Sequence, residues 1–271
     1  MIQQVTRTTR AYSAMAAMMP KLFLAYQFQI WFNVAMEIIT LTITVAFWRA
    51  VFAGQATVAG LTAAQTLNYV MLARIFHDGA YATSMLREFG ELMREGGIET
   101  VLLRPLDFQS SMYLQKLALL GLNLMMRLPL ALVAWLLFGL QLPANPAVWA
   151  ATAVTLLLGC TVMFGFDWIL ACAAFYTTDA WGLATIRQGV VLFFSGMLLP
   201  LAIMPAWLRN IAAVLPFSQA VYLPVSVLSG LTLLNQLPRI WLLQLVYLAA
   251  LLAASRLVFR RAVRVLTVQG G

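Results

Sequence analysis

Long apolar runs separated by short polar clusters make up this chain. A helix needs about 20 apolar residues to cross a hydrocarbon core about 30 Å thick, and six runs reach that length. The runs are apolar on every side, whereas the strands of a membrane barrel alternate between polar and apolar residues. The pattern therefore predicts an all-α integral membrane protein with six transmembrane helices, at residues 28–52, 64–86, 112–140, 147–172, 181–200 and 238–259.

Residues 1–27, which precede the first predicted span, also have a helical pattern. Apolar side chains recur there at helical spacing, at Tyr12, Met15, Met19, Leu22, Phe23 and Tyr26. Such a pattern is typical of an amphipathic helix that lies in the membrane interface; the alternative is a frayed tail. We expect an interfacial N-terminal helix on the cytoplasmic side, followed by a transmembrane domain over residues 28–271.

The region of residues 201–237, between the fifth and sixth predicted spans, is too apolar for a solvated loop. Pro200 lies just before this region, and Pro205, Pro216 and Pro224 interrupt it. Proline removes a backbone donor and clashes with the preceding turn of a helix, and non-helical backbone at membrane depth must be covered by protein or line a wet cavity. We therefore expect two short re-entrant helices on the outer side, near residues 206–214 and 217–228. The alternative is one kinked span, which would place the C-terminus outside.

The basic residues indicate how the chain is oriented in the membrane. The sequence has 63% hydrophobic and 10% charged residues and a formal net charge of +8, and cytoplasmic loops are enriched in Lys and Arg. With both termini in the cytoplasm, the residues on that side are Arg7, Arg10, Lys21, Arg87, Arg94, Arg104, Lys116, Arg256, Arg260, Arg261 and Arg264. The outer side then has Arg49, Arg209 and Arg239. The positive charge therefore indicates topology and contact with lipid, and not a nucleic-acid partner.

The densest group of charges lies in residues 87–111, between the second and third predicted spans. Acidic residues recur there every four positions, and apolar residues occupy the other side of the same helical pattern, at Phe89, Leu92, Met93, Ile98, Val101 and Leu102. The paired glycines Gly96 and Gly97 weaken a helix, and Pro105 ends one. The pattern predicts an amphipathic helix, a break and a second helical turn. An amphipathic element must cover something apolar, so we interpret this one as a docking surface; the alternative is a solvated loop.

Several ionisable residues fall inside the predicted spans, where they are costly and often mark a pathway or an ion pair. Candidates for a translocation path or for structural pairs are Glu37, Arg74, Asp78 and Arg127, and Asp167 and Arg187 also lie within spans. Glu37 and Arg74 reach similar depth on antiparallel spans, which fits a structural pair. Arg74 and Asp78 are also four residues apart and fit a pair within one helix. The sequence leaves both arrangements open.

Motifs of soluble enzymes are absent from the sequence. It has no phosphate-binding Gly-x-x-x-x-Gly-Lys-Ser/Thr loop, no His-Glu-x-x-His and no Gly-x-Ser-x-Gly. His77 has no second His or Cys nearby, and Cys160 and Cys172 are too few for a metal framework. We therefore expect no catalytic residues, no metal and no cofactor in this chain.

The stretch MREGGIETVLLRP resembles the signature of type-2 permeases of ATP-binding-cassette (ABC) transporters, known as ABC-2 permeases. The matching positions are Arg94, Gly96, Leu102, Leu103, Arg104 and Pro105, whereas Gly97 departs from the pattern. The resemblance covers the whole chain, because the proline-interrupted segment before the last span is also similar to that family. It implies that residues 87–111 contact an ATPase subunit, through Arg87, Glu88, Glu91, Arg94, Glu95, Glu99 and Arg104.

The resemblance also implies how such a chain works. It implies an exporter in the bacterial cytoplasmic (inner) membrane, with ATP and Mg²⁺ bound by two copies of a partner ATPase and with a second permease subunit, identical or related. Closure of the ATPases would push on the charged stretch and tilt the first spans, and the cargo would be a small amphiphilic compound or a polymer.

Two other functions remain open on the sequence alone. An ion-coupled secondary transporter predicts an internal repeat, and no repeat relates the first three spans to the last three. A membrane-embedded lipid-modifying enzyme predicts Asp, His and Arg together at one membrane face. Only Arg74, His77 and Asp78 fit that description, and they lie inside a predicted span.

Overall fold

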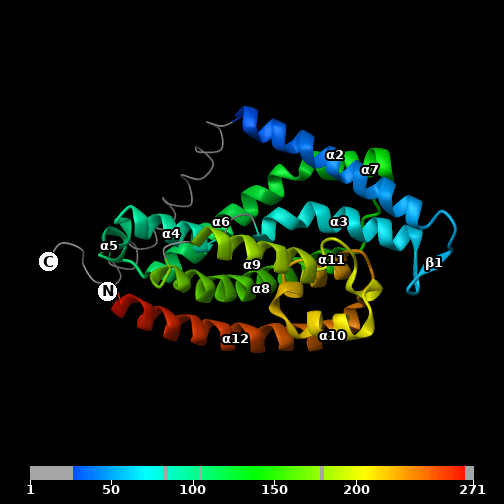
Figure 1. Cartoon of the computed structure of the whole chain (residues 1–271). Helices are drawn as coiled ribbons and strands as arrows, with labels where there is room; N and C mark the ends of the chain where they lie inside the picture. The colour runs from blue at the N-terminus through cyan, green and yellow to red at the C-terminus, as the bar shows by residue number, and fades with distance from the viewer. Residues whose placement is uncertain (1–26, 82–84, 104, 178–179, 266–271) are drawn as a thin grey trace.

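A computed structural model describes residues 27–81, 85–103, 105–177 and 180–265 (Figure 1). Its long helices are α2 (Gln27–Val51), α3 (Ala63–Tyr81), α6 (Phe108–Met126), α7 (Leu128–Phe138), α8 (Pro146–Ala171), α9 (Ala180–Phe194) and α12 (Leu237–Ala262). The predicted interfacial helix of residues 1–27 falls, except for its last residue, outside the described part of the chain, as does Arg104.

Shorter elements join the long helices. A two-stranded antiparallel ribbon, β1 (Thr57–Val58) and β2 (Leu61–Thr62), connects α2 to α3. The other short α-helices are α4 (Met85–Arg94), α5 (Gly97–Leu102), α10 (Ala206–Val214) and α11 (Tyr222–Leu228). Single 3₁₀ turns are η1 (Cys172–Phe175), η2 (Leu201–Ile203), η3 (Pro216–Gln219), η4 (Leu234–Gln236) and η5 (Val263–Val265).

Four helical segments in the described part of the chain are long and apolar enough to cross a bilayer: Trp31–Val51, Phe108–Phe138, Pro146–Phe175 and Leu234–Ala262. Large apolar side chains such as Trp135, Leu136 and Leu137 are exposed on them, as expected of a surface solvated by lipid. The protein is therefore an all-α, multi-pass membrane protein. Helix α3 contains charged residues and α9 has only 15 residues, so the count of six spans stays a prediction.

The long helices run between two ends of the molecule (Figure 1). Helices α4 and α5 and the C-terminal part of α12 lie at one end, which we name the α4–α5 end. The β-ribbon and α10 lie at the opposite end, the β-ribbon end. Helix α8 is the most buried of the long apolar helices and packs against α4, α11 and α12. It therefore contacts elements at both ends of the molecule.

Aromatic side chains form the core of the α4–α5 end. Phe89 of α4, Phe108 of α6 and Trp168 of α8 contact one another, and Phe259 of α12 contacts Phe108 and Trp168. Ring centroids in these pairs are 5.1–5.8 Å apart, within the range of favourable aromatic contacts. We name Phe89, Phe108, Trp168, Phe175 and Phe259 the aromatic cluster. It joins α4 to three long helices.

The third predicted span, residues 112–140, is broken in the structure. Helix α6 ends at Met126 and α7 begins at Leu128, with Arg127 between them. Pro129 in the first turn of α7 explains the break, because proline is tolerated at a helix start and not in the interior. The fifth predicted span is shorter than expected, since α9 ends at Phe194 and Gly196 has a left-handed φ of 80°.

The proline-interrupted region forms two helical pieces that we name the bent segment (α10 through α11). The two pieces, Ala206–Val214 and Pro216–Leu228, are bent by 78° relative to each other. Such a pair is either one broken span or a re-entrant loop. Its second piece packs closely on α8, because a Cβ added to Gly159 would lie 2.0 Å from the Gln219 carbonyl oxygen.

Candidate functional site

The charged stretch between the second and third predicted spans forms a helical hairpin, α4 and α5, at one end of the molecule (Figure 1). Gly96 separates the two helices with a φ of 67°, a left-handed conformation that glycine adopts at little cost. Helix α4 is amphipathic: Met85, Leu86 and Phe89 are buried, whereas Glu91 is exposed. The sequence therefore folds into a surface element with one apolar face and one acidic face.

A cavity of about 340 Å³ lies between this hairpin and α6. Its acidic lining consists of Glu88 and Glu91 of α4 and Glu95, the residue that follows α4. The remaining lining is mostly apolar and consists of Leu92, Val101, Leu106, Phe108, Ser111, Met112 and Gln115. We name this cavity the acidic pocket. An apolar floor beneath several carboxylates suits a positively charged side chain with an apolar stem, such as arginine or lysine.

The inner face of α4 is anchored on the long helices. Glu88 forms an ion pair with Lys116 of α6, and Arg87 Nη2 donates a hydrogen bond at 3.5 Å to Thr185 Oγ1 of α9. Gly90 approaches α9 so closely that an added Cβ would lie 2.8 Å from the Ala180 Cβ. Arg87 and Glu88 therefore hold the hairpin against the long helices.

The other predicted coupling residues face outward. Glu91, Arg94, Glu95 and Glu99 are exposed in the structure, and Arg104 lies outside the described residues. Of the predicted set, Glu91 and Glu95 combine exposure with a place in the lining of the acidic pocket. The residues predicted to contact an ATPase therefore have two roles in the structure. Arg87 and Glu88 anchor the hairpin, whereas Glu91, Arg94, Glu95 and Glu99 face outward.

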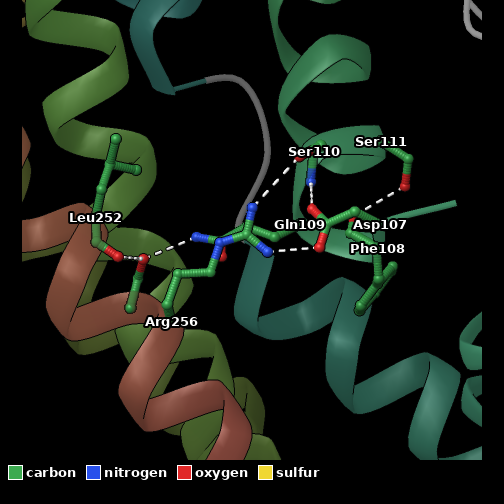
Figure 2. A network of polar contacts seen from close by, with 8 residues as sticks. Asp107, Phe108, Gln109, Ser110, Ser111, Leu252 and Arg256 are labelled. Carbon is green, nitrogen blue, oxygen red and sulfur yellow. Dashed lines mark hydrogen bonds and ion pairs between the residues drawn. The ribbon is translucent and has the colours of Figure 1, made fainter. Parts of the chain in front are cut away.

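A polar network joins the end of the hairpin to α12 (Figure 2). Asp107 caps α6 by accepting a hydrogen bond from the Ser110 backbone nitrogen at 2.7 Å. Its other carboxylate oxygen accepts a hydrogen bond from Arg256 Nη1 at 2.5 Å. Two residues after Asp107, Gln109 Nε2 donates a hydrogen bond at 2.7 Å to Oγ of Ser255, the residue before Arg256. We name Asp107, Gln109, Ser255 and Arg256 the α6–α12 junction.

The pKa of Asp107 is lowered from 3.8 to about 2 by this network. The hydrogen bond from Arg256 is the largest cause, and the hydrogen bonds to Ser110 also lower the pKa, whereas partial burial raises it. Because the folded pKa is depressed, the stabilising contribution of the ion pair is fully present above about pH 4 and is lost as the pH falls towards 2. The junction is therefore charged at every physiological pH. A helix-capping Asp before a span was visible in the sequence, but its partner Arg256 was not.

The structure brings together Glu37, Arg74 and Arg127 from α2, α3 and the α6–α7 break. Glu37 Oε2 lies 2.9 Å from Arg74 Nε and 3.3 Å from Arg127 Nη1. The contact with Arg74 is an ion pair without hydrogen-bond geometry. One carboxylate thus holds two guanidinium groups, which ties three helices together. The side chains of His77 and Asp78 lie outside the described part of the structure, so a pair between Arg74 and Asp78 stays a prediction.

Replacing Glu37 with glutamine is expected to lower the free energy of unfolding by about 1–3 kcal/mol, because it leaves the two mostly buried guanidinium groups of Arg74 and Arg127 without this counter-charge. Thermal unfolding of the purified protein in detergent measures the loss. Thr42→Val, on the same helix and exposed, is the control and is expected to leave the midpoint unchanged. Equal midpoints for Glu37→Gln and the wild type would show that the three helices do not depend on this carboxylate.

A second ion pair, between Asp167 of α8 and Arg187 of α9, is buried. Arg187 Nε lies 2.9 Å from Asp167 Oδ1 and Arg187 Nη2 lies 2.5 Å from Oδ2. Side-chain exposure is only 11% for Asp167 and 6% for Arg187. The sequence places both residues within spans but does not indicate that they pair. The short helix α9 is fixed to the central helix α8 by this two-bond contact.

A metal site needs several His, Cys, Asp or Glu side chains close together. Among the described residues, no group of three His, Cys, Asp or Glu side chains could hold a metal ion. Cys160 and Cys172 are both free thiols. The functional features that the structure does provide are an acidic pocket, an anchored amphipathic hairpin and intramembrane ion pairs.

Several apolar helices of spanning length define a multi-pass membrane protein, and this one has a charged hairpin at one end. Residues 38–270 match the family described as ABC-2 family transporter protein. The match covers most of the chain, so the chain belongs to the ABC-2 transporter family and is a transport subunit. Permeases of this family generally work with an ABC ATPase. Among curated proteins, none matches this sequence.

Proposed function

We propose that this chain is the permease subunit of an ABC-2 exporter and that the α4–α5 hairpin receives the movement of a separate ATPase. The observation that carries the proposal is the exposed acidic side of α4 beside a cavity of about 340 Å³, in a chain of the ABC-2 family. Two ATPase copies would supply the ATP hydrolysis. A second permease, identical or related, would complete the translocation path.

The distribution of charge supports a cytoplasmic position for the α4–α5 end. The exposed Arg256, Arg260 and Arg261 lie in the last turns of α12, and the exposed Arg264 lies in the following turn η5. The C-terminal part of α12 is at this end (Figure 1). Arg49 lies in the last turn of α2, just before the β-ribbon, Arg209 lies in α10, and Arg239 lies in the first turn of α12. Cytoplasmic segments are enriched in basic residues, so the proposed topology has six spans with both termini in the cytoplasm of a bacterial cell. The bent segment would then be re-entrant on the outer side.

The two faces of α4 support the role of the hairpin in coupling. Its inner face is fixed to α6 and α9 through Glu88, Arg87 and Gly90, so a force on the hairpin reaches the long helices. Its outer face presents Glu91 and Glu95 at the acidic pocket. The complementary partner is a surface of the ATPase with a protruding basic side chain, because opposite charges across an interface favour the correct partner.

Reversing the acidic face is expected to remove the ATPase. In Glu91→Lys/Glu95→Lys, basic side chains of the partner meet like charges, which costs several kcal/mol, so co-purified ATPase falls by at least about tenfold. The measurement is the ratio of ATPase to permease after affinity purification from native membranes. Thr100→Lys, which adds a positive charge at an exposed hairpin position outside the pocket lining, is the control.

Two outcomes would contradict the proposal. One is an unchanged ATPase ratio in the doubly reversed variant, which would remove the acidic face from the interface. The other is vectorial transport by the chain alone in liposomes without ATP, which would favour an ion-coupled transporter.

A further inference from the structure

We infer that α12, the last long helix, is the element through which movement of the α4–α5 hairpin reaches the bent segment, and that the α6–α12 junction passes this movement to it. The residues of the junction are then positioning residues for transport. The inference rests on the proposed function, because it assumes that an ATPase moves the hairpin. It differs from the expectation that the push tilts the first spans.

The junction lies directly after the hairpin in the chain. Helix α5 ends at Leu102 and α6 begins at Phe108, so only a short connection separates the hairpin from Asp107. Pro105 lies in this connection, and its ring fixes φ near −65°, which reduces the slack between the two. Asp107 is also fixed by its own capping bond to Ser110. A displacement of the hairpin therefore reaches the first turn of α6.

Three hydrogen bonds then attach this turn of α6 to the adjacent residues Ser255 and Arg256 of α12 (Figure 2). Arg256 bonds Asp107 and, through Nη2 at 3.4 Å, the Ser110 hydroxyl. The bond from Gln109 to Ser255 is buried, with Ser255 at 0% exposure and Gln109 at 2%. Because the attachments involve neighbouring residues on both helices, they resist sliding and rotation of α12 relative to α6.

The aromatic cluster makes the same connection by packing. Phe108, between the two bonded residues of α6, has its ring centroid 5.4 Å from Phe89 of α4 and 5.8 Å from Phe259 of α12. Close-packed side chains transmit displacements, because there is no free volume to absorb them. Helix α4 itself packs on α8, η1 and α9, and α8 in turn packs most extensively on α12. By contrast, α2 packs mainly against α3 and α7. The contacts of the hairpin thus lead to the last long helix.

The other end of α12 contacts the bent segment. Tyr247 Oη donates a hydrogen bond at 2.5 Å to the carbonyl oxygen of Val214, the last residue of α10. The buried Gln244 Nε2 donates to the carbonyl oxygen of Gln219 at 3.4 Å and to that of Thr155 at 3.1 Å. Gln244 and Ser255 are about 16 Å apart along one uninterrupted helix. Helix α12 therefore connects the hairpin to both pieces of the bent segment.

Distance measurements between spin labels test this route in the assembled transporter. The permease and its co-purified ATPase are placed in lipid nanodiscs, with Cys160 and Cys172 replaced by alanine and labels at Trp207→Cys on α10 and Val154→Cys on α8, both exposed positions. ATP with orthovanadate is the probe. With the unaltered junction, adding ATP and orthovanadate is expected to shift the distance between the two labels. With Arg256→Asp, this shift is expected to be lost.

Three further variants separate transmission from folding. Asp107→Arg/Arg256→Asp exchanges the charges and is expected to regain the shift. Gln109→Met/Ser255→Ala replaces both bonded groups with apolar ones, which is nearly neutral for folding. This variant is expected to reduce the shift, and it tests the route even if Arg256→Asp fails to fold. Arg261→Asp makes the same charge change at an exposed position of α12 that forms no ion pair among the described residues. It is expected to keep the shift.

The outcomes distinguish this inference from the proposed function. If no ATPase is recovered with the wild type, the proposed function and the inference both fail. If an ATPase is recovered and hydrolyses ATP, either of two results overturns the inference alone. The first is the absence of any shift in the unaltered junction. The second is a shift of full size in both Arg256→Asp and Gln109→Met/Ser255→Ala.

Discussion

Replacing Arg187 with methionine is expected to destabilise the protein by about 3–5 kcal/mol, because it leaves Asp167 as a buried charge without this partner. The guanidinium contacts both carboxylate oxygens of Asp167, and both side chains are almost inaccessible. The expected result is a large fall in the midpoint of thermal unfolding in detergent.

A double replacement separates the loss of a charge partner from the loss of packing. Asp167→Leu/Arg187→Met removes both charges, and replacing a buried pair with apolar residues is often neutral or stabilising. We therefore expect most of the lost stability to return. Arg239→Met, at an exposed position of α12, changes stability by less than about 0.5 kcal/mol. If Arg187→Met and Arg239→Met have the same midpoint of thermal unfolding, the buried pair of Asp167 and Arg187 contributes nothing to stability.

Replacing Gly159 with valine is expected to be nearly as damaging, at about 3 kcal/mol or more, since overpacking costs 1–3 kcal/mol even where side chains can adjust. An added Cβ would lie 2.0 Å from the Gln219 carbonyl oxygen and 2.9 Å from the Ala220 Cα. These are backbone atoms, so no side-chain rotation relieves the clash. The bent segment must move away from α8 or the substitution must distort α8.

Gly121 provides the matched control, because it also lies inside a long helix and an added Cβ meets no atom within 4 Å. Gly121→Val is expected to leave the unfolding midpoint close to that of the wild type. Hydrogen exchange of residues 216–228 shows whether Gly159→Val loosens the bent segment before the remainder unfolds. Equal stability and equal exchange in the two valine variants would contradict the close packing of Gly159 on Gln219.

Local features of this fold were predictable, because their causes lie within a few residues. Apolar runs predict the long helices, and Gly96 breaks the hairpin where the paired glycines lie. Prolines precede and interrupt the bent segment. Pro129 was also visible, and the structure shows that it divides the third span at Arg127. A run of apolar residues by itself does not reveal such a break, because hydropathy is averaged over the whole run.

Contacts between distant parts of the chain were not predictable. The bond from Arg256 to Asp107 joins residues 149 positions apart, and the pairing of Asp167 with Arg187 depends on how α8 and α9 face each other. A sequence without aligned homologues shows that a buried charge needs a partner, but it does not select one. The two ion pairs of Glu37 were unpredictable for the same reason, because Arg74 and Arg127 reach this carboxylate only when three helices pack together.

The two-sided construction of α4 has a consequence for the divergence of such transporters. Phe89 and Gly90, which hold the hairpin in place, are followed directly by Glu91 and, just past the end of α4, by Glu95, and these two carboxylates do not contribute to the core. Under the proposed function, mutations at the outer positions alter which motor is recruited without lowering the stability of the permease. After gene duplication, two copies in one cell can therefore acquire separate, non-interfering motors through a few substitutions on a single helical face.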